Sequence, residues 1–485
     1  MNQDERWVKQ LSPKSEDFSK WYLELIRKAE LADYAPMKGM MVIRPYGFAV
    51  WENIQRLLDK RIKETGHVNA YFPLFIPESL FQKEMEHLKG FAPEVAWVTH
   101  GGSDELEERL AVRPTSEAII GYMYSKWIKS YRDLPVLINQ WANIVRWEKV
   151  TRPFLRTTEF LWQEGHTAHA TPEEAQQETL MILSSVYKEF VETDLAIPVI
   201  AGKKTDREKF AGALETYAIE GLMGDGKALQ MGTSHNLGQH FAKVFDIRFE
   251  DRNQNLQYAW QTSWGVSTRL IGALVMSHGD ESGLFFPPSI APVQVVVIPI
   301  ALGNWKENVL PMAKEITADL IRAGVRVKLD DREEFTPGWK FSEYEMRGVP
   351  LRLEIGPRDV KENKVVLVRR DGTGKESLPI GGIQDRIPQV LTEIQKSLYA
   401  GALKFQADHT HQVGDYDDFK NVMEIKRGFI KAFWCGDQSC EDKIKDETMS
   451  TIRILPLDQE FDKADAKCIC CRREGRALAY FARAY

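Results

Sequence analysis

The sequence predicts an α+β domain, in which an antiparallel sheet is flanked by helices, followed by an α/β domain and a small cysteine-bearing domain. Helix and strand patterns between residues 171 and 268 lack strict βα alternation, which favours an antiparallel sheet. A strand–helix–strand pattern starts at Val293, and all five cysteines lie at position 435 or beyond. The 485 residues suffice for about three domains. We place them at 1–288, 289–400 and 401–485.

In the first domain, two helices precede the sheet. Apolar residues at helical spacing mark an amphipathic helix over residues 18–29. A second helix follows Pro45 and continues to Ile62. Gly66 ends it, and an apolar strand leads to Pro73.

A long helix and further strands follow. Thr171 and Glu174 form a capping box with Pro172 at the first helical position, which predicts a helix reaching about Leu195. We expect strands over 215–223, 228–231 and 257–264, and a helix beginning near Thr268.

The two smaller domains begin after a proline-rich break at residues 285–288. Val293–Ile298 predicts a buried strand, and residues 309–320 carry the apolar stripe of a helix that Gly324 ends. A hairpin is expected around residues 371–374. The α/β domain is therefore expected to end near Ala400, with the cysteine-bearing domain beyond it.

Composition limits the cellular setting. Hydrophobic residues make up 43% and charged residues 28%, which fits a soluble globular protein. No apolar run approaches the ~20 residues of a membrane span, and the polar N-terminus lacks a secretory signal. We therefore expect a cytoplasmic protein with neither a membrane nor DNA as partner. With a net charge of −6, an RNA-binding surface would have to be a local basic patch.

The cysteines predict a metal site. In a chain without an export signal, clustered thiols favour metal binding over disulfides. Two pairs of thiolates suit a tetrahedral zinc ion. Cys435, Cys440 and Cys468 are the firmer ligands, and the fourth is Cys470 or Cys471. Reduced, buried thiols are the alternative.

The stretch from Asn143 to His169 carries the chemistry. Apolar and charged residues alternate from Ile144 to Glu148, which predicts a strand with Arg146 and Glu148 on one face. A charged loop precedes a return strand with four polar or aromatic side chains on a single face: Phe160, Trp162, Glu164 and His166. Buried charges are tolerated when they are paired or used, so this face predicts a site for an anionic ligand with a flat ring. A solvated face with cross-strand ion pairs is the alternative.

The same residues carry a family resemblance. Arg146-x-Glu148, a loop and Arg156-x-x-x-Phe160 resemble motif 2 of the class II aminoacyl-tRNA synthetases. Residues 160–166, FLWQEGH, are similar to the prolyl-tRNA synthetases of archaeal and eukaryotic type, and the resemblance covers essentially the whole chain. The helix and strand ending in Pro73 resemble motif 1, which forms the dimer interface in that family. Residues 264–272, with Arg269, resemble motif 3.

The resemblance implies a homodimeric proline–tRNA ligase. Such an enzyme activates L-proline with ATP and Mg²⁺ to prolyl-adenylate and transfers it to the 3′ end of tRNA(Pro). Carboxylate attack on the α-phosphorus of ATP brings two anions together, and the planar forks of arginines suit their alignment. Arg146 and Arg269 take the catalytic positions.

The remaining site residues are carried over from the family's motifs. Those implied for proline are Thr115, Glu117, Arg146, Trp162, Glu164, His166 and His235. Those implied for ATP are Arg146, Glu148, Arg156, Thr157, Phe160, Gln230, Thr233, Ser267 and Arg269.

Further expectations follow from the same resemblance. The α/β domain resembles an anticodon-binding domain, and the zinc is structural with Cys471 as fourth ligand, because some members resemble Cys-x-x-Cys here. The length between His166 and Trp264 leaves no room for the editing domain inserted in bacterial-type relatives.

The rival interpretations are a class II ligase for threonine or glycine, and a synthetase-like RNA-binding protein without catalysis. The residues around Thr115 and Trp162 argue against the first, and the retained arginines 146, 156 and 269 argue against the second.

Overall fold

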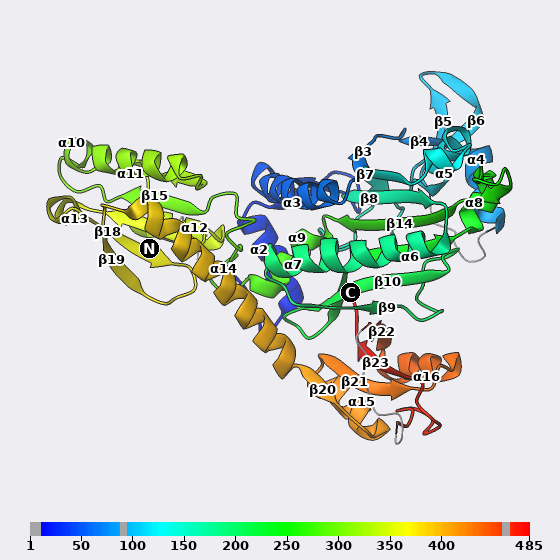
Figure 1. Cartoon of the computed structure of the whole chain (residues 1–485). Helices are drawn as coiled ribbons and strands as arrows, with labels where there is room; N and C mark the ends of the chain where they lie inside the picture. The colour runs from blue at the N-terminus through cyan, green and yellow to red at the C-terminus, as the bar shows by residue number, and fades with distance from the viewer. Residues whose placement is uncertain (1–10, 88–94, 458–465) are drawn as a thin grey trace.

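The computed structural model describes residues 11–87, 95–457 and 466–485. A central sheet of 11 strands dominates it (Figure 1). In spatial order its strands are β20 (Thr410–Gln412), β21 (Phe429–Trp434), β23 (Ala477–Ala482), β22 (Thr451–Pro456), β9 (Val199–Lys203), β10 (Glu215–Leu222), β11 (Ala228–Gly238), β14 (Trp260–Ser267), β8 (Glu159–His169), β7 (Val136–Val145) and β3 (Val68–Asn69). The strands from β22 to β7 pair antiparallel, which confirms the predicted α+β class.

The strand predicted over residues 144–148 is shorter than expected. β7 ends at Val145, whose N–H donates to the carbonyl of Arg113 at 3.2 Å. Arg146 and Glu148 follow the strand and are not part of it, so the prediction that they share a strand face is wrong. The N–H of Arg146 still donates to the carbonyl of Thr158 at 2.8 Å, so pairing extends by one hydrogen bond beyond the strand, and the side chain of Arg146 lines a pocket.

Helices from the first 278 residues cover the sheet and complete its core. α2 (Phe18–Lys28) buries Trp21, Tyr22, Leu25 and Ile26, as its apolar stripe predicts. α3 (Pro45–Glu64) and α9 (Arg269–His278) contribute to the same core. The predicted long helix consists of α6 (Pro172–Met181), a π-helical stretch η2 (Ile182–Lys188) and α7 (Glu189–Thr193). Thr171 caps it, because its side chain accepts from the N–H of Glu174 at 3.2 Å.

A smaller layer lies beyond β7. It contains a three-stranded sheet of β4 (Phe75–Pro77), β6 (Asp104–Val112) and β5 (Trp97–Gly101). α4 (Glu78–His87), α5 (Glu117–Trp127) and α8 (His240–Phe245) pack beside it. Two short hairpins complete this half of the chain: β1 (Ala32–Tyr34) with β2 (Met41–Ile43), and β12 (Arg248–Glu250) with β13 (Leu256–Tyr258).

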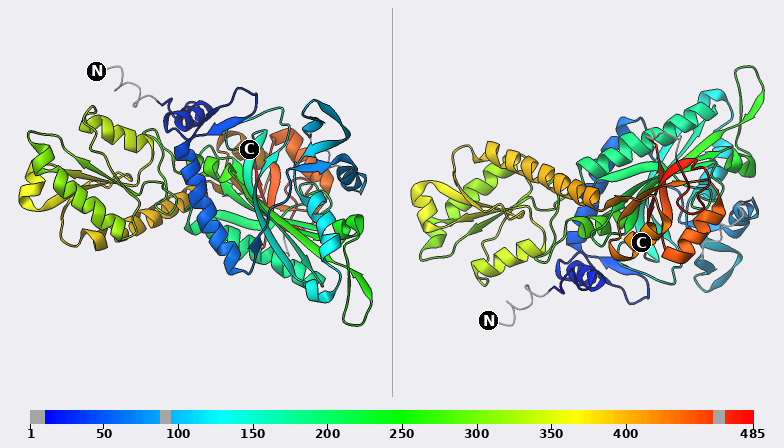
Figure 2. Two further views of the ribbon diagram at one scale, coloured as in Figure 1. Left: turned by 90° about the horizontal axis from the view of Figure 1, so that it is seen from above. Right: turned by 90° about the horizontal axis from the view of Figure 1, so that it is seen from below.

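The α/β domain projects from one end of the central sheet (Figure 2). Its five strands are ordered β16 (Val327–Leu329), β15 (Val295–Pro299), β17 (Leu351–Ile355), β18 (Lys364–Arg369) and β19 (Lys375–Pro379). α10 (Trp305–Asn308), α11 (Leu310–Arg322), α12 (Pro337–Met346) and α13 (Pro357–Glu362) connect them. The strand, helix and hairpin predicted after residue 288 are all present.

One helix crosses the boundary placed near Ala400. α14 (Ile383–Asp408) starts against the core of the α/β domain, through Ile387, Val390 and Ile394, and continues to the cysteine-bearing domain (Figure 1). Gly401 suggests a break at this point. A glycine inside a helix costs only about 1 kcal/mol relative to alanine, so a helix of 26 residues tolerates it.

The cysteine-bearing segment joins the central sheet. β22 pairs with β9 at Leu455 and Lys203, so β20 to β23 extend the sheet of the first domain. α15 (Tyr416–Ile425) and α16 (Gln438–Thr448) pack on these strands. Among residues 11–87, 95–457 and 466–485, no helix combines the length and apolar character needed to cross a membrane.

Candidate active site

A pocket of about 310 Å³ opens over the middle of the central sheet. β8, β11 and β14 form its floor, and the segments at 115–117 and 208–216 form its walls. The predicted residues that line it are Thr115, Glu117, Arg146, Phe160, Trp162, Glu164, His166, Gln230, Thr233, His235, Ser267 and Arg269. The sequence thus predicted site residues in five separate segments, and the fold brings these segments together around one cavity.

Arg146 lies between the aromatic and the acidic parts of the pocket. Its Nε donates to the carbonyl of Pro114 at 2.9 Å, and its guanidinium lies 5.6 Å from the ring centroid of Phe160 and 5.7 Å from that of Trp162. Burial lowers the pKa of Arg146, and the charges of three nearby glutamates, Glu117 first among them, oppose this. The backbone contact fixes the plane of the fork beside the cavity.

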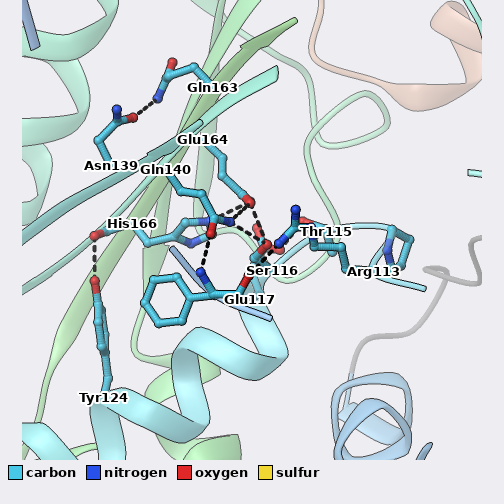
Figure 3. Close-up of polar contacts among 12 residues, drawn as sticks. Arg113, Thr115, Ser116, Glu117, Tyr124, Asn139, Gln140, Gln163, Glu164 and His166 are labelled. Atoms are coloured by element: carbon cyan, nitrogen blue, oxygen red, sulfur yellow. Dashed lines mark hydrogen bonds and ion pairs between the residues drawn. The ribbon is translucent and has the colours of Figure 1, made fainter. Parts of the chain in front are cut away.

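Glu164 is the centre of a buried hydrogen-bond network (Figure 3). Its Oε1 accepts from Ser116 Oγ at 2.5 Å and from Gln140 Nε2 at 2.7 Å. Its Oε2 pairs with His166 Nε2 at 3.0 Å. Because its partners hold both oxygens in place, this carboxylate is preorganised to face a cationic ligand group.

The second carboxylate enters from the start of α5. Glu117 accepts a hydrogen bond from the hydroxyl of Thr115, and both residues are almost fully buried. Two glutamates, at positions 117 and 164, thus point toward the same end of the pocket (Figure 3). That end suits a cationic amine.

The two histidines of the pocket differ in their electrostatics. Burial lowers the pKa of His166, but the hydrogen bond and charge of Glu164 outweigh it, so the pKa of His166 is raised. Burial and the neighbouring His166 lower the pKa of His235 to about 3. His235 is therefore neutral near pH 7, and its Nδ1 lies 3.0 Å from Thr216 Oγ1.

Arg269 faces the pocket from the first residue of α9. Its Nε lies 3.3 Å from the carbonyl of Leu155, and its Nη1 lies 3.3 Å from that of Gln230. Burial lowers its pKa, and the charge of Arg146 adds to the effect. Two partly buried cations that repel each other across one cavity are stabilised by an anion between them, so this part of the pocket suits phosphate or carboxylate.

Three predicted residues lie outside the pocket lining. Arg156 donates from Nε to Glu148 Oε2 at 2.7 Å, and its side chain is 62% exposed. The hydroxyl of Thr157 donates to the carbonyl of Glu159 at 2.7 Å. The Arg156–Glu148 pair belongs to the loop between β7 and β8, so the fold leaves it at the rim rather than inside.

Sequence reasoning missed one wall. Glu208 and Phe210 line the pocket from the connection between β9 and β10, and Thr216 lines it from the start of β10. The ring centroid of Phe210 lies 4.8 Å from that of His235. The backbone N–H of Phe210 donates to Thr216 Oγ1 at 2.9 Å. The run KKTDREKF has the composition of a solvated loop. Its single aromatic residue is the only signal that it covers a ligand site.

The four predicted cysteines form a second candidate site. The sulfurs of Cys435, Cys440, Cys468 and Cys471 all lie within 4.8 Å of one another, and Cys435 is 3.7 Å from both Cys440 and Cys471. Four thiolates at ~2.3 Å from a tetrahedral zinc lie roughly 3.8 Å apart, so the donor set fits that ion. Cys470 is not in this cluster, which agrees with the choice of Cys471.

The surroundings also favour a thiolate at Cys471. Although burial acts in the opposite direction, hydrogen bonds from Arg473 lower the pKa of Cys471 to about 6. The Nε of Arg473 lies 3.3 Å from this sulfur. A thiolate is the form that ligates a metal.

Three family models match successive parts of the chain. Residues 97–278 match a family model for the tRNA synthetase class II core domain (G, H, P, S and T). Residues 294–389 match an anticodon-binding domain, and residues 416–485 match a prolyl-tRNA synthetase C-terminal domain.

Full-length relatives extend the agreement. A proline–tRNA ligase of Natranaerobius thermophilus is 58% identical over 99% of both chains, and one of Alkaliphilus oremlandii is 55% identical over the same shares. A crystal structure of prolyl-tRNA synthetase from Cryptosporidium parvum with halofuginone and AMPPNP superposes with a TM-score of 0.95. It is 43% identical and covers 99% of this chain and 100% of its own. The chain therefore belongs to the prolyl-tRNA synthetase family of the class II aminoacyl-tRNA synthetases.

Proposed function

We propose that this chain is a proline–tRNA ligase, which activates L-proline with ATP to prolyl-adenylate, releasing diphosphate, and then transfers the prolyl group to the 3′ end of tRNA(Pro), releasing AMP. One observation carries the proposal: the pocket has two buried glutamates, Glu117 and Glu164, beside Arg146, and a second arginine, Arg269, on the side of Arg146 away from them. A second Cryptosporidium parvum structure, 40% identical with a TM-score of 0.93, was solved with L-proline and AMP. A ligand that is anionic at one end and carries an amine at the other matches this polarity.

The arginines align the two anions of the first step. Arg146 spans the join of the two subsites, where its fork binds the proline carboxylate and the α-phosphate together. Arg269 holds the outer phosphates from the start of α9, where the helix N-terminus adds favourable partial charge. As negative charge shifts to the leaving diphosphate, both guanidiniums stabilise it without reorganising.

The glutamates receive the secondary amine. Glu117 and Glu164 accept from the two N–H groups of the prolyl ammonium, and the hydroxyl of Thr115 holds Glu117 in place. The rings of Trp162 and His166 enclose the pyrrolidine ring. His235, being neutral, adds a ring wall without adding a charge that would repel the ammonium.

The rim and floor complete the nucleotide subsite. Phe160 stacks on adenine, and Glu148 accepts from its amino group. Arg156 reaches the outer phosphates from the rim. Thr157, Thr233 and Ser267 supply hydroxyls, and Gln230 supplies an amide oxygen of the kind that Mg²⁺ takes beside phosphate oxygens.

The other parts of the chain serve RNA binding and assembly. Residues 289–400 form the anticodon-binding domain for tRNA(Pro), and residues 401–485 form a domain ordered by structural zinc on four cysteines. Residues 1–288 form the catalytic domain and make a cytoplasmic homodimer through α3 and the strand after it, as motif 1 does in class II enzymes. Exposed side chains of Val68, Tyr71 and Phe75 support an interface there.

We also assign the chain to the archaeal and eukaryotic type without the editing insertion. Between β8 and β14 the connection consists of core helices and strands from α6 to β13. The end-to-end match with the Cryptosporidium parvum enzyme supports the same assignment. Removal of mischarged alanine would then require a separate protein.

ATP–diphosphate exchange measured with each of the 20 amino acids tests the proposal. Proline is expected to give the highest rate and alanine a detectable one, because alanine lacks two of proline's ring carbons and each missing methylene is worth only ~1–3 kcal/mol in an apolar pocket. Charging of tRNA(Pro) with labelled proline tests the second step. Strong exchange with threonine or glycine and none with proline would assign the chain to another class II ligase.

A further inference from the structure

The pocket wall that sequence reasoning missed is held from outside by the cysteine-bearing domain. We call residues 204–210 the pocket loop: it follows β9 and ends at Phe210, which lines the cavity. Its side chains at positions 204, 205, 207 and 208 all contact α16 or β22. These contacts join residues more than 200 positions apart in sequence.

Helix α16 makes two of these links. Thr205 Oγ1 donates to Glu441 Oε1 at 2.9 Å, and both side chains are buried. Arg207 pairs with Asp442. Both acidic residues directly follow Cys440, one of the clustered cysteines, so the cluster and the loop contacts share the first turn of one helix.

Strand β22 makes the other links through a buried ion network. Lys204 Nζ lies 2.5 Å from Glu220 Oε1 and 2.7 Å from the carbonyl of Arg453. Arg453 Nη2 donates to the same carboxylate oxygen at 2.9 Å, and its Nη1 lies 3.8 Å from Glu208, which lines the pocket. Buried charges of this kind are strongly destabilising when one partner is removed, so the network determines the path of the loop.

We propose that α16 and β22 clamp the pocket loop, and that Glu441 and Asp442 are positioning residues for amino-acid binding. Neither residue lines the pocket. They act through the loop, which places Phe210 against His235 at the end of the cavity that carries the glutamates. This inference rests on the proposed function for its kinetic readout but not for its structural one.

The test uses the full-length protein with Glu441→Met and Asp442→Ala combined. Methionine keeps the volume of the buried glutamate but cannot accept from Thr205, and alanine removes the pair with Arg207. A hydrogen bond of ordinary strength corresponds to about a three- to tenfold effect, so the KM for proline should rise by about that factor. The KM for ATP and the kcat of exchange should stay near wild type.

Two controls separate positioning from general destabilisation. Asp446→Ala removes one acidic charge from an exposed position of the same helix and should leave both KM values unchanged. Glu441→Gln, made as a single substitution, retains an oxygen that accepts from Thr205, so its KM for proline should equal that of wild type. A loss of folded protein alone would lower the apparent kcat and leave the KM for proline unchanged, and that result would overturn the proposal.

Hydrogen–deuterium exchange supplies a readout that does not depend on activity. The amides of residues 204–214 should exchange about three- to tenfold faster in the double variant, while α9 and β8 keep their protection. If wild type shows no proline-dependent exchange of diphosphate, the proposed function fails and this measurement alone decides the clamp. If the double variant does not fold, Asp442→Ala alone, which removes the acceptor for Arg207 at a half-exposed position, carries the same measurements. Unchanged protection of the pocket loop in a folded variant overturns the clamp.

Discussion

Replacing Arg146 by alanine is expected to lower the rate of adenylate formation by about 10²–10³-fold, or about 3–4 kcal/mol. That is the usual effect of losing one preorganised donor to a developing charge in a water-poor site. Arg146 meets the condition because it is partly buried in the pocket wall and its Nε donates to the carbonyl of Pro114. Its neighbours Glu117 and Glu164 also lose the charge that offsets their mutual repulsion.

The same substitution has a structural effect of a different size. The carbonyl of Pro114 loses its donor, which costs about 1 kcal/mol. For a domain of this size the melting temperature should then fall by about 2–4 °C. Binding of tRNA(Pro) should persist, because the proposed anticodon contacts lie in residues 289–400. A catalytic loss much larger than the stability loss is therefore the signature of the proposed role.

ATP–diphosphate exchange at saturating proline measures the loss of catalytic rate, and differential scanning calorimetry measures the fall in melting temperature. Arg248→Ala is a matched control, because Arg248 pairs with Asp246 at the surface at 2.7 Å. Exposed pairs contribute only ~0–1 kcal/mol to stability, so this substitution should change the exchange rate by less than about twofold. Arg146→Lys keeps the charge but loses the bidentate fork, so its rate should lie between the two. Exchange by Arg146→Ala within about threefold of wild type, against the expected 10²–10³-fold loss, would remove Arg146 from the mechanism.

The other predictions concern metal, packing and pH. Elemental analysis should find one zinc per chain, lost in Cys471→Ser and retained in Cys470→Ser; the reverse result would show that the wrong fourth ligand was chosen. Gly165→Ala should destabilise the fold by about 1–3 kcal/mol or more in thermal denaturation, because its Cβ would lie 2.1 Å from Trp264 Cζ2; an unchanged melting temperature would contradict this. Burial lowers the pKa of His278 to about 4, so its contribution to stability is complete above the unfolded pKa of about 6.5 and is lost as the pH falls toward 4. Between pH 6.5 and 5 the wild type should therefore lose up to about 2 kcal/mol more folding stability than the His278→Gln variant, as measured by calorimetry. Parallel pH profiles of the two proteins would refute the assignment.

Local sequence patterns predicted much of the secondary structure and most of the side chains expected in the site that line the pocket. The alternation in residues 160–166 placed Phe160, Trp162 and Glu164 on one face of a strand, and β8 has that form. Capping at Thr171 and the apolar stripe of residues 18–29 placed two helices correctly. These signals act between residues a few positions apart, so they can be read from a single chain.

Local patterns failed where a pairing partner decided the outcome. The alternation that continues beyond Val145 suggested a longer strand. The N–H of Arg146 still donates to the carbonyl of Thr158 at 2.8 Å, but the regular strand ends at Val145 and the side chain of Arg146 lines the pocket. Glu148 and Arg156, which stay predicted nucleotide-binding residues, pair with each other at the rim and do not line the pocket. Alternation reports which side of the chain is polar and not whether a neighbouring strand is present.

Only the tertiary structure decided how the distant segments meet. The charged run at 204–208 reads as a solvated loop, yet Lys204 and Thr205 are buried because Glu220, Glu441 and Arg453 satisfy their polar groups. Likewise, the cysteine-bearing segment shares a sheet with the first domain through β22 and β9. Such contacts depend on closing chain loops of more than 200 residues, and no pattern within a short window of sequence records which residues will meet when they close.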